Sequence, residues 1–313
     1  MIIMTMLNLA ITIRSFNYDG MAINKLNNTF TITYANRSGQ RLSEAALVHA
    51  LSGADCVIAG TETFNDAVFE HSPRLKAISR VGTGLDSIDL VAAKTRGIAI
   101  LSTPRSPITA VTEHTISLIF SVMKNIPYYN DAMRKGSPQI RPGRLLAGKK
   151  VGILGLGKIG ARVAAALDFF GCTVTYYDPF TPQPPDPAWK MVGSLPELVK
   201  DIDILTLHAS ADPAAPPLID ADVLSVSKQG LIIINTARGT LIDEAALLEA
   251  LKTGQVSGAG LDVFCHEPYS MGLLTLPQVI ATPHVASNTI ESRDEMESEA
   301  AENLIRYFSE RVS

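Results

Sequence analysis

The sequence VGILGLGKIG occupies residues 151–160 and carries three glycines at the spacing G-x-G-x-x-G. Its first four residues have the apolar composition of a short buried strand. After such a strand, Gly155 permits a tight turn and Gly157 lets the backbone approach a bound pyrophosphate, while Gly160 lets the following helix pack closely. The start of that helix presents backbone N–H groups and a positive dipole end to phosphates. The stretch therefore predicts a phosphate-binding turn between a strand and a helix.

The residues that follow complete this pattern. Residues 158–170 are rich in helix formers, and residues 173–177 form a second β-rich run that ends at Asp178. An acid about 20 residues after the glycine turn accepts hydrogen bonds from a ribose 2′-hydroxyl. Strand, turn, helix, strand and acid in this order predict a dinucleotide site, and His208, at the end of a later strand, is expected to line its groove. Because a carboxylate at Asp178 repels a 2′-phosphate, NAD is favoured over NADP.

Composition bounds the class of protein. The chain has 313 residues, of which 46% are hydrophobic and 19% charged, and this suits a globular protein of two domains. A net charge of -4 gives no reason to expect nucleic acid or a membrane as a partner. The three cysteines are far apart, which favours reduced thiols in the cytoplasm over disulfides. No sequence motif has metal-ligand spacing, so no metal site is predicted.

Strands and helices alternate along the chain, which predicts an α/β fold with parallel sheets and helices on both faces. Two prolines within residues 102–107 interrupt any regular element and mark a domain boundary. An amphipathic helix over residues 288–308, expected to be acidic on its outer face, should return to the first domain. The prediction is two Rossmann-like parallel-sheet domains, the second inserted in the first. They comprise residues 1–103 with 288–313, the substrate domain, and residues 104–287, the NAD-binding domain.

Candidate catalytic side chains stand where three predicted strands end, and parallel sheets place ligands at the carboxyl ends of their strands. Arg238 follows one strand, Asp262 ends the next with Glu267 shortly after it, and His284 follows the last. Arg238 can hold a substrate carboxylate in a forked pair and polarise a neighbouring carbonyl. His284 can exchange a proton with the developing alkoxide, while Glu267 fixes the tautomer of its imidazole.

Each of these residues also has a less specific interpretation. A lone arginine after a strand is most often part of a surface salt bridge, and a lone histidine before a loop is usually structural. Their joint appearance at successive strand ends favours the catalytic interpretation. His266 competes with His284 as the partner of Glu267, but neighbours on an extended loop tend to point apart. Cys265 has no dedicated base, so no catalytic role is predicted for it. Three further histidines lie on or near predicted helices and are expected to be structural: His49, His71 and His114.

Four motifs extend the pattern over the whole chain. They are GLGKIG at residues 155–160, INTARGTLIDEAALLEAL at 234–251, GAGLDVFCHEP at 258–268 and TPHVAS at 282–287. In this order they resemble the D-isomer-specific 2-hydroxyacid dehydrogenases, which are NAD-dependent enzymes. The resemblance implies a split first domain closed by the last helix. It also implies hydride transfer between nicotinamide and a small 2-oxo or D-2-hydroxy acid, and a homodimer formed through the nucleotide domain and its leading helix.

The resemblance further implies roles for individual residues. Arg238 would bind the substrate, Glu267 would support the histidine, and His284 would be the acid and base. The residues implied to contact the cofactor are Lys158, Ile159, Asp178, Thr236, Ala237, Arg238 and Asp262, the last of them near the nicotinamide carboxamide. The loop implied to bind the substrate carboxylate through backbone N–H groups contains Val81, Gly82 and Thr83.

Several alternatives stay open at this point. Residues 80–90 look most like 3-phosphoglycerate dehydrogenases, but residues 59–62 lack the arginines that some of those enzymes place there for the phosphate. The substrate could equally be glyoxylate, hydroxypyruvate or another short 2-oxo acid, and Arg105 is expected near the cleft. An L-specific lactate- or malate-type dehydrogenase would start with its Rossmann unit, unlike this chain. A different class of function is an NAD(H)-sensing scaffold like the transcriptional corepressors that share this fold.

Overall fold

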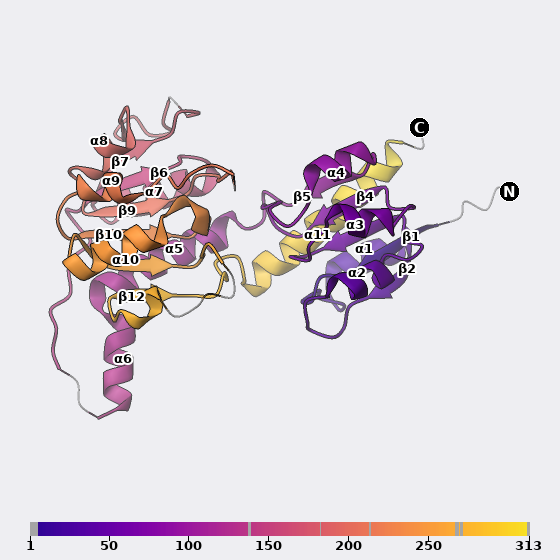
Figure 1. Ribbon diagram of the computed structural model, residues 1–313, viewed down its shortest axis with the longest axis horizontal. Helices are drawn as coiled ribbons and strands as arrows, with labels where there is room; N and C mark the ends of the chain where they lie inside the picture. Colours follow the sequence, from indigo (N-terminus) through magenta and orange to yellow (C-terminus); the bar gives the residue numbers. More distant parts are fainter. Residues whose placement is uncertain are drawn as a thin grey trace. The chain divides into compact units, whose positions relative to one another are not determined.

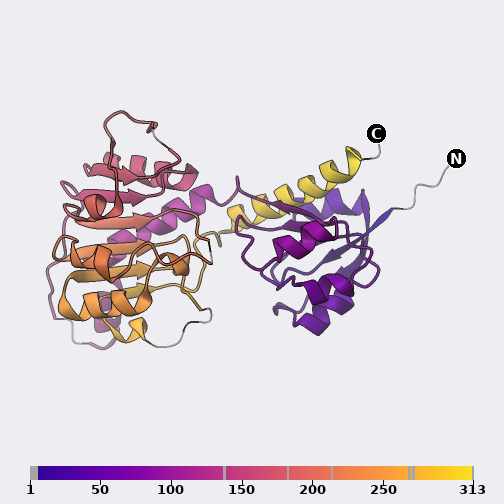
Figure 2. The same ribbon diagram turned by 45° about the horizontal axis from the view of Figure 1, so that its top comes forward.

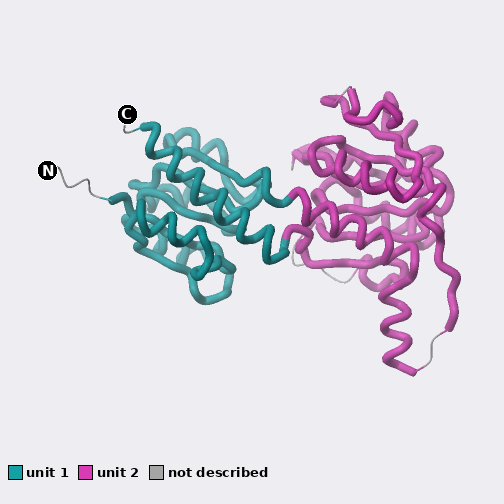
Figure 3. The backbone as a smooth tube through the Cα atoms, turned by 180° about the vertical axis from the view of Figure 1, so that it is seen from behind, with its two compact units in different colours: residues 1–107, 288–313 teal, residues 108–287 magenta. Residues whose placement is uncertain are grey.

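The chain folds into two compact units (Figure 3). The computed structural model describes residues 6–136, 139–181, 183–212, 214–266, 269 and 272–311. Unit 1 runs to Pro107 and resumes at Asn288, and unit 2 spans Ile108–Ser287. Unit 2 is therefore inserted in unit 1, and the predicted arrangement of two α/β domains with parallel sheets is confirmed. The chain first passes from unit 1 to unit 2 between residues 107 and 108, whereas the boundary predicted from the sequence lay between residues 103 and 104.

Unit 1 is built on a five-stranded sheet of order β2-β1-β3-β4-β5, in which every pair is parallel. Several of its helices begin at a side chain that accepts a backbone N–H bond, such as Ser43 and Asn65. The strands are β1 (Leu7–Ile11), β2 (Phe30–Ala35), β3 (Cys56–Ala59), β4 (Ala77–Arg80) and β5 (Ala99–Ser102). The helices are α1 (Met21–Asn27), α2 (Glu44–Ala50), α3 (Asp66–Glu70), α4 (Leu90–Thr95) and α11 (Ile290–Ser309).

Apolar side chains on the two faces of this sheet form two separate cores. On one face, Leu9 and Ile11 pack with residues of α1 and α11, including Leu26 and Leu304. The other face packs against α2, α3 and α4. Figure 2 shows α11, in yellow, running along the sheet of unit 1. The last helix thus completes the first domain, as its position after the dinucleotide unit predicted.

The exposed face of α11 carries Glu291, Glu295 and Glu302, as the sequence predicted, but two further glutamates of this helix are buried. Glu297 is 1% exposed and Glu299 is 6% exposed. Glu299 accepts hydrogen bonds from Arg105 Nε at 3.0 Å and Ser106 Oγ at 2.5 Å, and Glu297 accepts one from the backbone N–H of Asn17 at 2.8 Å. These two carboxylates can be buried because loops far away in the sequence supply hydrogen-bond donors to them.

Unit 2 contains a seven-stranded sheet of order β12-β11-β10-β9-β6-β7-β8, again with parallel pairs throughout. Its strands are β6 (Lys150–Leu154), β7 (Thr173–Tyr177), β8 (Lys190–Met191), β9 (Ile204–Leu207), β10 (Leu231–Asn235), β11 (Val256–Leu261) and β12 (Val279–Ala281). Its helices are α5 (Ile108–Lys124), α6 (Ile126–Arg134), α7 (Lys158–Phe169), α8 (Leu195–Val199), α9 (Ala221–Ser225), α10 (Glu244–Thr253) and the 3-10 turns η1 (Gly239–Leu241) and η2 (Leu273–Thr275).

The sheet of unit 2 is also covered on both faces. Successive strand residues alternate between the two sides, so Ile153 contributes to the core under α5 and α7 while Leu154 contributes to the core under α8, α9 and α10.

The α6 helix was not predicted from the sequence, and it projects away from this sheet (Figure 1). Among the described residues, no helix combines the length and the apolar character needed to cross a membrane.

The buried position of Glu299 generates a stability prediction. Glu299→Gln replaces a buried charged acceptor by an amide and places an NH₂ group opposite one of its two donors. We expect it to lower the free energy of unfolding by about 1–3 kcal/mol. The matched control is Glu295→Gln on the exposed face of the same helix, which should change stability by less than about 0.5 kcal/mol. Urea unfolding of both variants measures the difference, and equal midpoints would contradict the prediction.

Candidate active site

Three neighbouring strands of unit 2 end at the same edge of the sheet. In the register, Asn235 of β10 lies opposite Leu261 of β11, which lies opposite Ala281 of β12. The pairing continues one residue further, because the N–H of Asp262 donates to Asn235 O and that of Thr282 donates to Leu261 O, both at 2.9 Å. The segments that carry Arg238, Asp262 and His284 therefore leave the sheet side by side. Glu267, predicted to support the histidine, lies outside the described residues.

The turn that carries Arg238 is held by the side chain of Asn235. Its Nδ2 donates to Arg238 O at 2.8 Å, and its Oδ1 accepts the N–H of Ala237 at 3.0 Å. Gly239 then allows a close approach, since a Cβ there would lie 2.0 Å from the carbonyl carbon of Phe264. Only glycine fits against this backbone. The half-buried Arg238 is thus placed directly beside the segment that runs from β11 toward Glu267.

Asp262 is a buried carboxylate, 0% exposed, that organises the loop after β12. Its Oδ1 accepts bonds from Thr282 Oγ1 at 2.5 Å and the N–H of Val285 at 2.9 Å, and its Oδ2 accepts the N–H of Ala286 at 2.8 Å. Burial alone would raise the pKa of Asp262. The bonds from His114, Thr282 and the two backbone donors outweigh burial and hold this pKa below its ordinary value. The carboxylate is therefore ionised at neutral pH.

His284 occupies the middle of the loop that Asp262 holds. Its backbone lies in the left-handed region, with φ 54°, which is uncommon for a residue other than glycine. Its N–H donates to Asp262 O at 2.8 Å and to Thr282 O at 3.1 Å. The residue is exposed, so the loop fixes its backbone while leaving the imidazole accessible. A contact between Asp262 and a nicotinamide stays a prediction, because both oxygens of this carboxylate are engaged by donors of unit 2.

The glycine turn between β6 and α7 has the geometry that its sequence predicts. Gly155 has φ 88°, and a Cβ there would lie 2.6 Å from the backbone nitrogen of Ala209. A Cβ on Gly160 would lie 2.0 Å from Gly155 O, so this glycine is required for close packing. Gly157 caps α7, and a Cβ there would meet nothing within 4 Å. The first N–H groups of α7, at Lys158 and beyond, thus face open space suited to a phosphate.

Asp178 follows β7 and lies beside the same turn. Its Oδ2 accepts the N–H of Leu156 and its Oδ1 accepts the N–H of Phe180, both at 2.8 Å. The carboxylate thus ties the glycine turn to the end of β7 and places negative charge there. Residues 179–187, which follow, contain no lysine or arginine. This end of the site offers a carboxylate and no cation from the following segment.

Three further side chains near these strand ends have environments that limit their chemistry. Burial lowers the pKa of His208 to about 3, so its imidazole is neutral and bonds Thr206 Oγ1 at 2.9 Å. Burial raises the pKa of the Cys265 thiol to about 11, which agrees with the absence of a predicted nucleophilic role. Thr236, predicted to contact the cofactor, is buried and its hydroxyl bonds Thr115 Oγ1 at 2.8 Å.

In unit 1, the predicted substrate loop follows β4. The N–H of Val81 donates to Ala59 O at 2.9 Å, and the N–H of Gly82 donates to Thr103 Oγ1 at 2.7 Å. Both donors are therefore engaged within unit 1, and a substrate carboxylate would take bonds from Thr83 onward or displace these acceptors. Its contacts with this loop stay a prediction. Arg105, the side chain expected near the cleft, is paired with Glu299 on α11.

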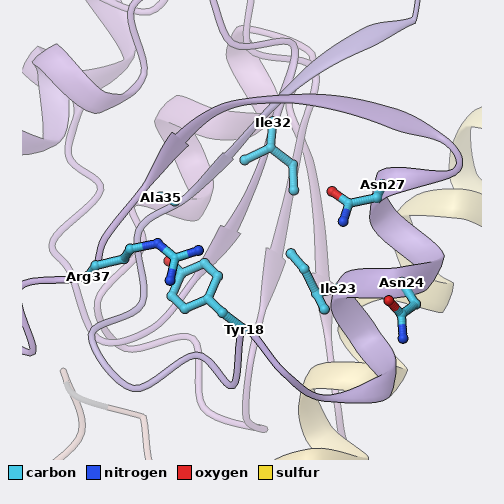
Figure 4. A pocket seen from close by; sticks show the side chains of 7 residues that line it. All are labelled: Tyr18, Ile23, Asn24, Asn27, Ile32, Ala35 and Arg37. Carbon is cyan, nitrogen blue, oxygen red and sulfur yellow. The ribbon is translucent and has the colours of Figure 1, made fainter.

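One hollow of unit 1 lies away from the predicted site residues. This hollow has a volume of about 360 Å³ and lies between α1 and the edge strand β2 (Figure 4). Its lining residues are Tyr18, Ile23, Asn24, Asn27, Ile32, Ala35 and Arg37. None of them is among the predicted site residues, and Arg37 is stacked over the Tyr18 ring at 4.1 Å. Within the described part of the chain, no group of three or more histidine, cysteine or acidic residues could hold a metal ion.

Comparisons with known proteins agree with this geometry. The model of the D-isomer specific 2-hydroxyacid dehydrogenase NAD-binding domain matches residues 116–286. The D-3-phosphoglycerate dehydrogenase of Mycobacterium tuberculosis is 36% identical over 263 residues, covering 82% of this chain and 50% of that protein. The chain thus spans about half the length of such relatives. The hydroxypyruvate reductase of Thermotoga maritima is 33% identical over 276 residues, covering 86% of this chain and 90% of that protein.

Solved structures agree as well. A glyoxylate reductase from Paecilomyes thermophila has a TM-score of 0.85 and 28% identity, covering 96% of this chain and 95% of that one. An acyclic imino acid reductase in complex with NADPH and D-Arg has a TM-score of 0.86 and 27% identity, covering 98% of both chains. The match to the family model and the identity to curated relatives over most of this chain agree with the glycine turn and the strand-end residues. The chain therefore belongs to the D-isomer specific 2-hydroxyacid dehydrogenase family.

Proposed function

We propose that this protein transfers a hydride between nicotinamide and C2 of a small 2-oxo or D-2-hydroxy acid. The observation that carries the proposal is the arrangement of unit 2, in which the segments bearing Arg238, Asp262 and His284 leave adjacent strands β10, β11 and β12. The same sheet edge carries the glycine turn of a dinucleotide site. A guanidinium and an imidazole beside such a site suit the reduction of a carbonyl next to a carboxylate.

Each residue has a defined part in the reaction. Arg238 binds the substrate carboxylate in a forked pair and polarises the neighbouring carbonyl. His284 donates the proton to the oxygen of that carbonyl during reduction and accepts it in the reverse direction. Glu267 accepts a hydrogen bond from His284 and fixes the tautomer of its imidazole. The cofactor supplies the hydride when bound, and Lys158 and Ile159, at the start of α7, lie where backbone N–H groups bind its phosphates.

We propose NAD as the preferred cofactor. Asp178 places a carboxylate at the ribose end, where it accepts bonds from a 2′-hydroxyl and repels a 2′-phosphate. Residues 179–187 offer no cation to pair with such a phosphate. The imino acid reductase was solved with NADPH, and a glyoxylate/hydroxypyruvate reductase from Sinorhizobium meliloti was solved with NADP. Both of these neighbours hold the phosphorylated cofactor, so the proposal of NAD for this chain rests on Asp178 and the segment after it.

We propose that the substrate is one of three short acids that the relatives suggest: 3-phosphoglycerate or its 2-oxo form, hydroxypyruvate, or glyoxylate. Residues 59–62 carry no arginine, and their one charged side chain, Glu62, is buried and accepts the N–H of Gly60 at 2.7 Å. A phosphate on the substrate would find no cation in this segment. This feature favours the two acids without a phosphate.

We also propose a cytoplasmic homodimer. Three reduced thiols suit a cytoplasmic location. The α6 helix projects from unit 2 (Figure 1). Along α6 and the segment after it, four large apolar side chains are 50% to 85% exposed: Ile126, Met133, Ile140 and Leu145. Exposed apolar side chains gathered on one projecting element are typical of a protein–protein contact.

The proposed function is tested by offering the protein NADH with a panel of 2-oxo acids and following absorbance at the nicotinamide band. We expect oxidation of NADH with at least one of glyoxylate, hydroxypyruvate and 3-phosphohydroxypyruvate. Tight binding of NADH with no reduction of any 2-oxo acid would contradict the proposal. That result would favour the corepressor-like sensing scaffold instead.

The role of His284 can be separated from that of its neighbour His266. His284→Ala removes the proton donor, and general acid–base catalysis contributes about 10²- to 10⁴-fold to such steps. We expect kcat to fall by a factor in that range while the Kd for NADH changes little, because the imidazole acts on the substrate. His266→Ala is the matched control, an exposed imidazole on a nearby segment, and should leave kcat nearly unchanged. Loss of turnover in His266→Ala alone would reverse the assignment.

The role of Asp178 can be read from cofactor selectivity. Asp178→Ala removes the charge that repels a 2′-phosphate and the acceptor for a 2′-hydroxyl. We expect the ratio of kcat/KM for NADH to that for NADPH to fall about tenfold, which corresponds to about 1.4 kcal/mol. Because this carboxylate also accepts two backbone N–H bonds, the melting temperature of the variant should be measured alongside. An unchanged selectivity ratio in a folded variant would remove Asp178 from the ribose site.

A further inference from the structure

One polar side chain of α5 reaches the loop that carries His284. His114 lies in the first half of this helix and is 21% exposed. Its Nε2 is 3.0 Å from Thr282 Oγ1 and 3.5 Å from Asp262 Oδ1. The sequence predicted only a structural role for this histidine. Its position against a loop that carries a catalytic candidate suggests a more specific one.

The direction of the hydrogen bonds in this group follows from the number of available protons. Asp262 is ionised and can only accept, so the single hydroxyl proton of Thr282 is donated to Asp262 Oδ1. The Thr282 oxygen must then act as the acceptor toward His114, whose Nε2 carries the proton. The Nε2–H of His114 thus faces both Thr282 Oγ1 and Asp262 Oδ1, and the Thr282 hydroxyl donates to the same carboxylate. All three side chains lie in unit 2.

These contacts end on the group that sets the conformation of His284. The Asp262 carboxylate also accepts the N–H groups of Val285 and Ala286. A left-handed backbone at a residue other than glycine is unfavourable and persists only where surrounding contacts hold it. The contacts that hold the backbone of His284 include the bonds from its N–H to Asp262 O and Thr282 O. Without a donor from α5, Thr282 and Asp262 lose the contact that fixes their positions against this helix.

We propose that His114 is a positioning residue, which holds Thr282 and Asp262 in the arrangement that presents His284 to the substrate. This inference rests on the proposed function for its effect on turnover, but the arrangement itself can be measured without it. His114 makes no contact with the reacting atoms in this account. What it supplies is one N–H donor at a fixed place on the surface of α5.

The activity test compares two substitutions that differ in that donor. His114→Gln keeps an N–H group near the position of Nε2, whereas His114→Leu keeps the bulk and removes the donor. We expect His114→Leu to lower kcat by about ten- to a hundredfold through misplacement of His284, with the KM for NADH changed less than twofold. His114→Gln should restore kcat to within about threefold of the wild type. The control is His49→Leu on the exposed face of α2, which should leave both constants unchanged.

A second measurement does not depend on turnover. Amide hydrogen exchange of the peptide spanning residues 282–286 should be at least about tenfold faster in His114→Leu than in the wild type, because the Val285 and Ala286 bonds open more often. His114→Gln should exchange like the wild type. Unchanged exchange in His114→Leu overturns the proposal even if no substrate is ever found. Equal loss of kcat in the Gln and Leu variants also overturns it, while leaving the proposed function intact.

Discussion

The candidate active site depends on the hydrogen bonds that the buried carboxylate of Asp262 accepts. Removing a carboxylate from water costs several kcal/mol unless hydrogen bonds replace the lost hydration. The donors that replace it here come from the loop after β12, at Thr282, Val285 and Ala286. The same bonds therefore satisfy a buried charge and fix a loop. Because His284 lies in that loop, the hydrogen bonds that the loop donates to Asp262 also hold the left-handed backbone of His284.

The parallel sheet explains why this loop lies beside the other reactive groups. Parallel strands end at one edge, and crossover connections bring segments that are distant in sequence to that edge. Arg238 and Asp262 are 24 residues apart, yet their segments are adjacent because β10 pairs with β11. Gly239 completes the arrangement, since any side chain there would overlap the backbone after β11. The position of Arg238 beside the segment after β11 thus depends on the strand order and on Gly239.

Much of this could be predicted from the sequence, where the signal is local. The glycine turn and the alternation of strands and helices both depend on residues close together in the chain, and the structure confirms them. Individual side-chain contacts between distant segments, which strand order does not determine, could not be predicted. Burial of Glu299 depends on Arg105, and the role of His114 depends on Thr282, far along the chain in both cases. A histidine on a helix gives no local sign of the loop that it will meet.

The central claim is that Arg238, Glu267 and His284 act together on one carbonyl next to a bound nicotinamide. The most direct measurement is a crystal structure of the protein with NADH and oxamate, a mimic of a 2-oxo acid that is not reduced. The account predicts that the oxamate carbonyl oxygen accepts hydrogen bonds from both His284 and Arg238, and that Glu267 contacts the other ring nitrogen of His284. Oxamate bound elsewhere, or bound with its carbonyl oxygen away from His284, would contradict it.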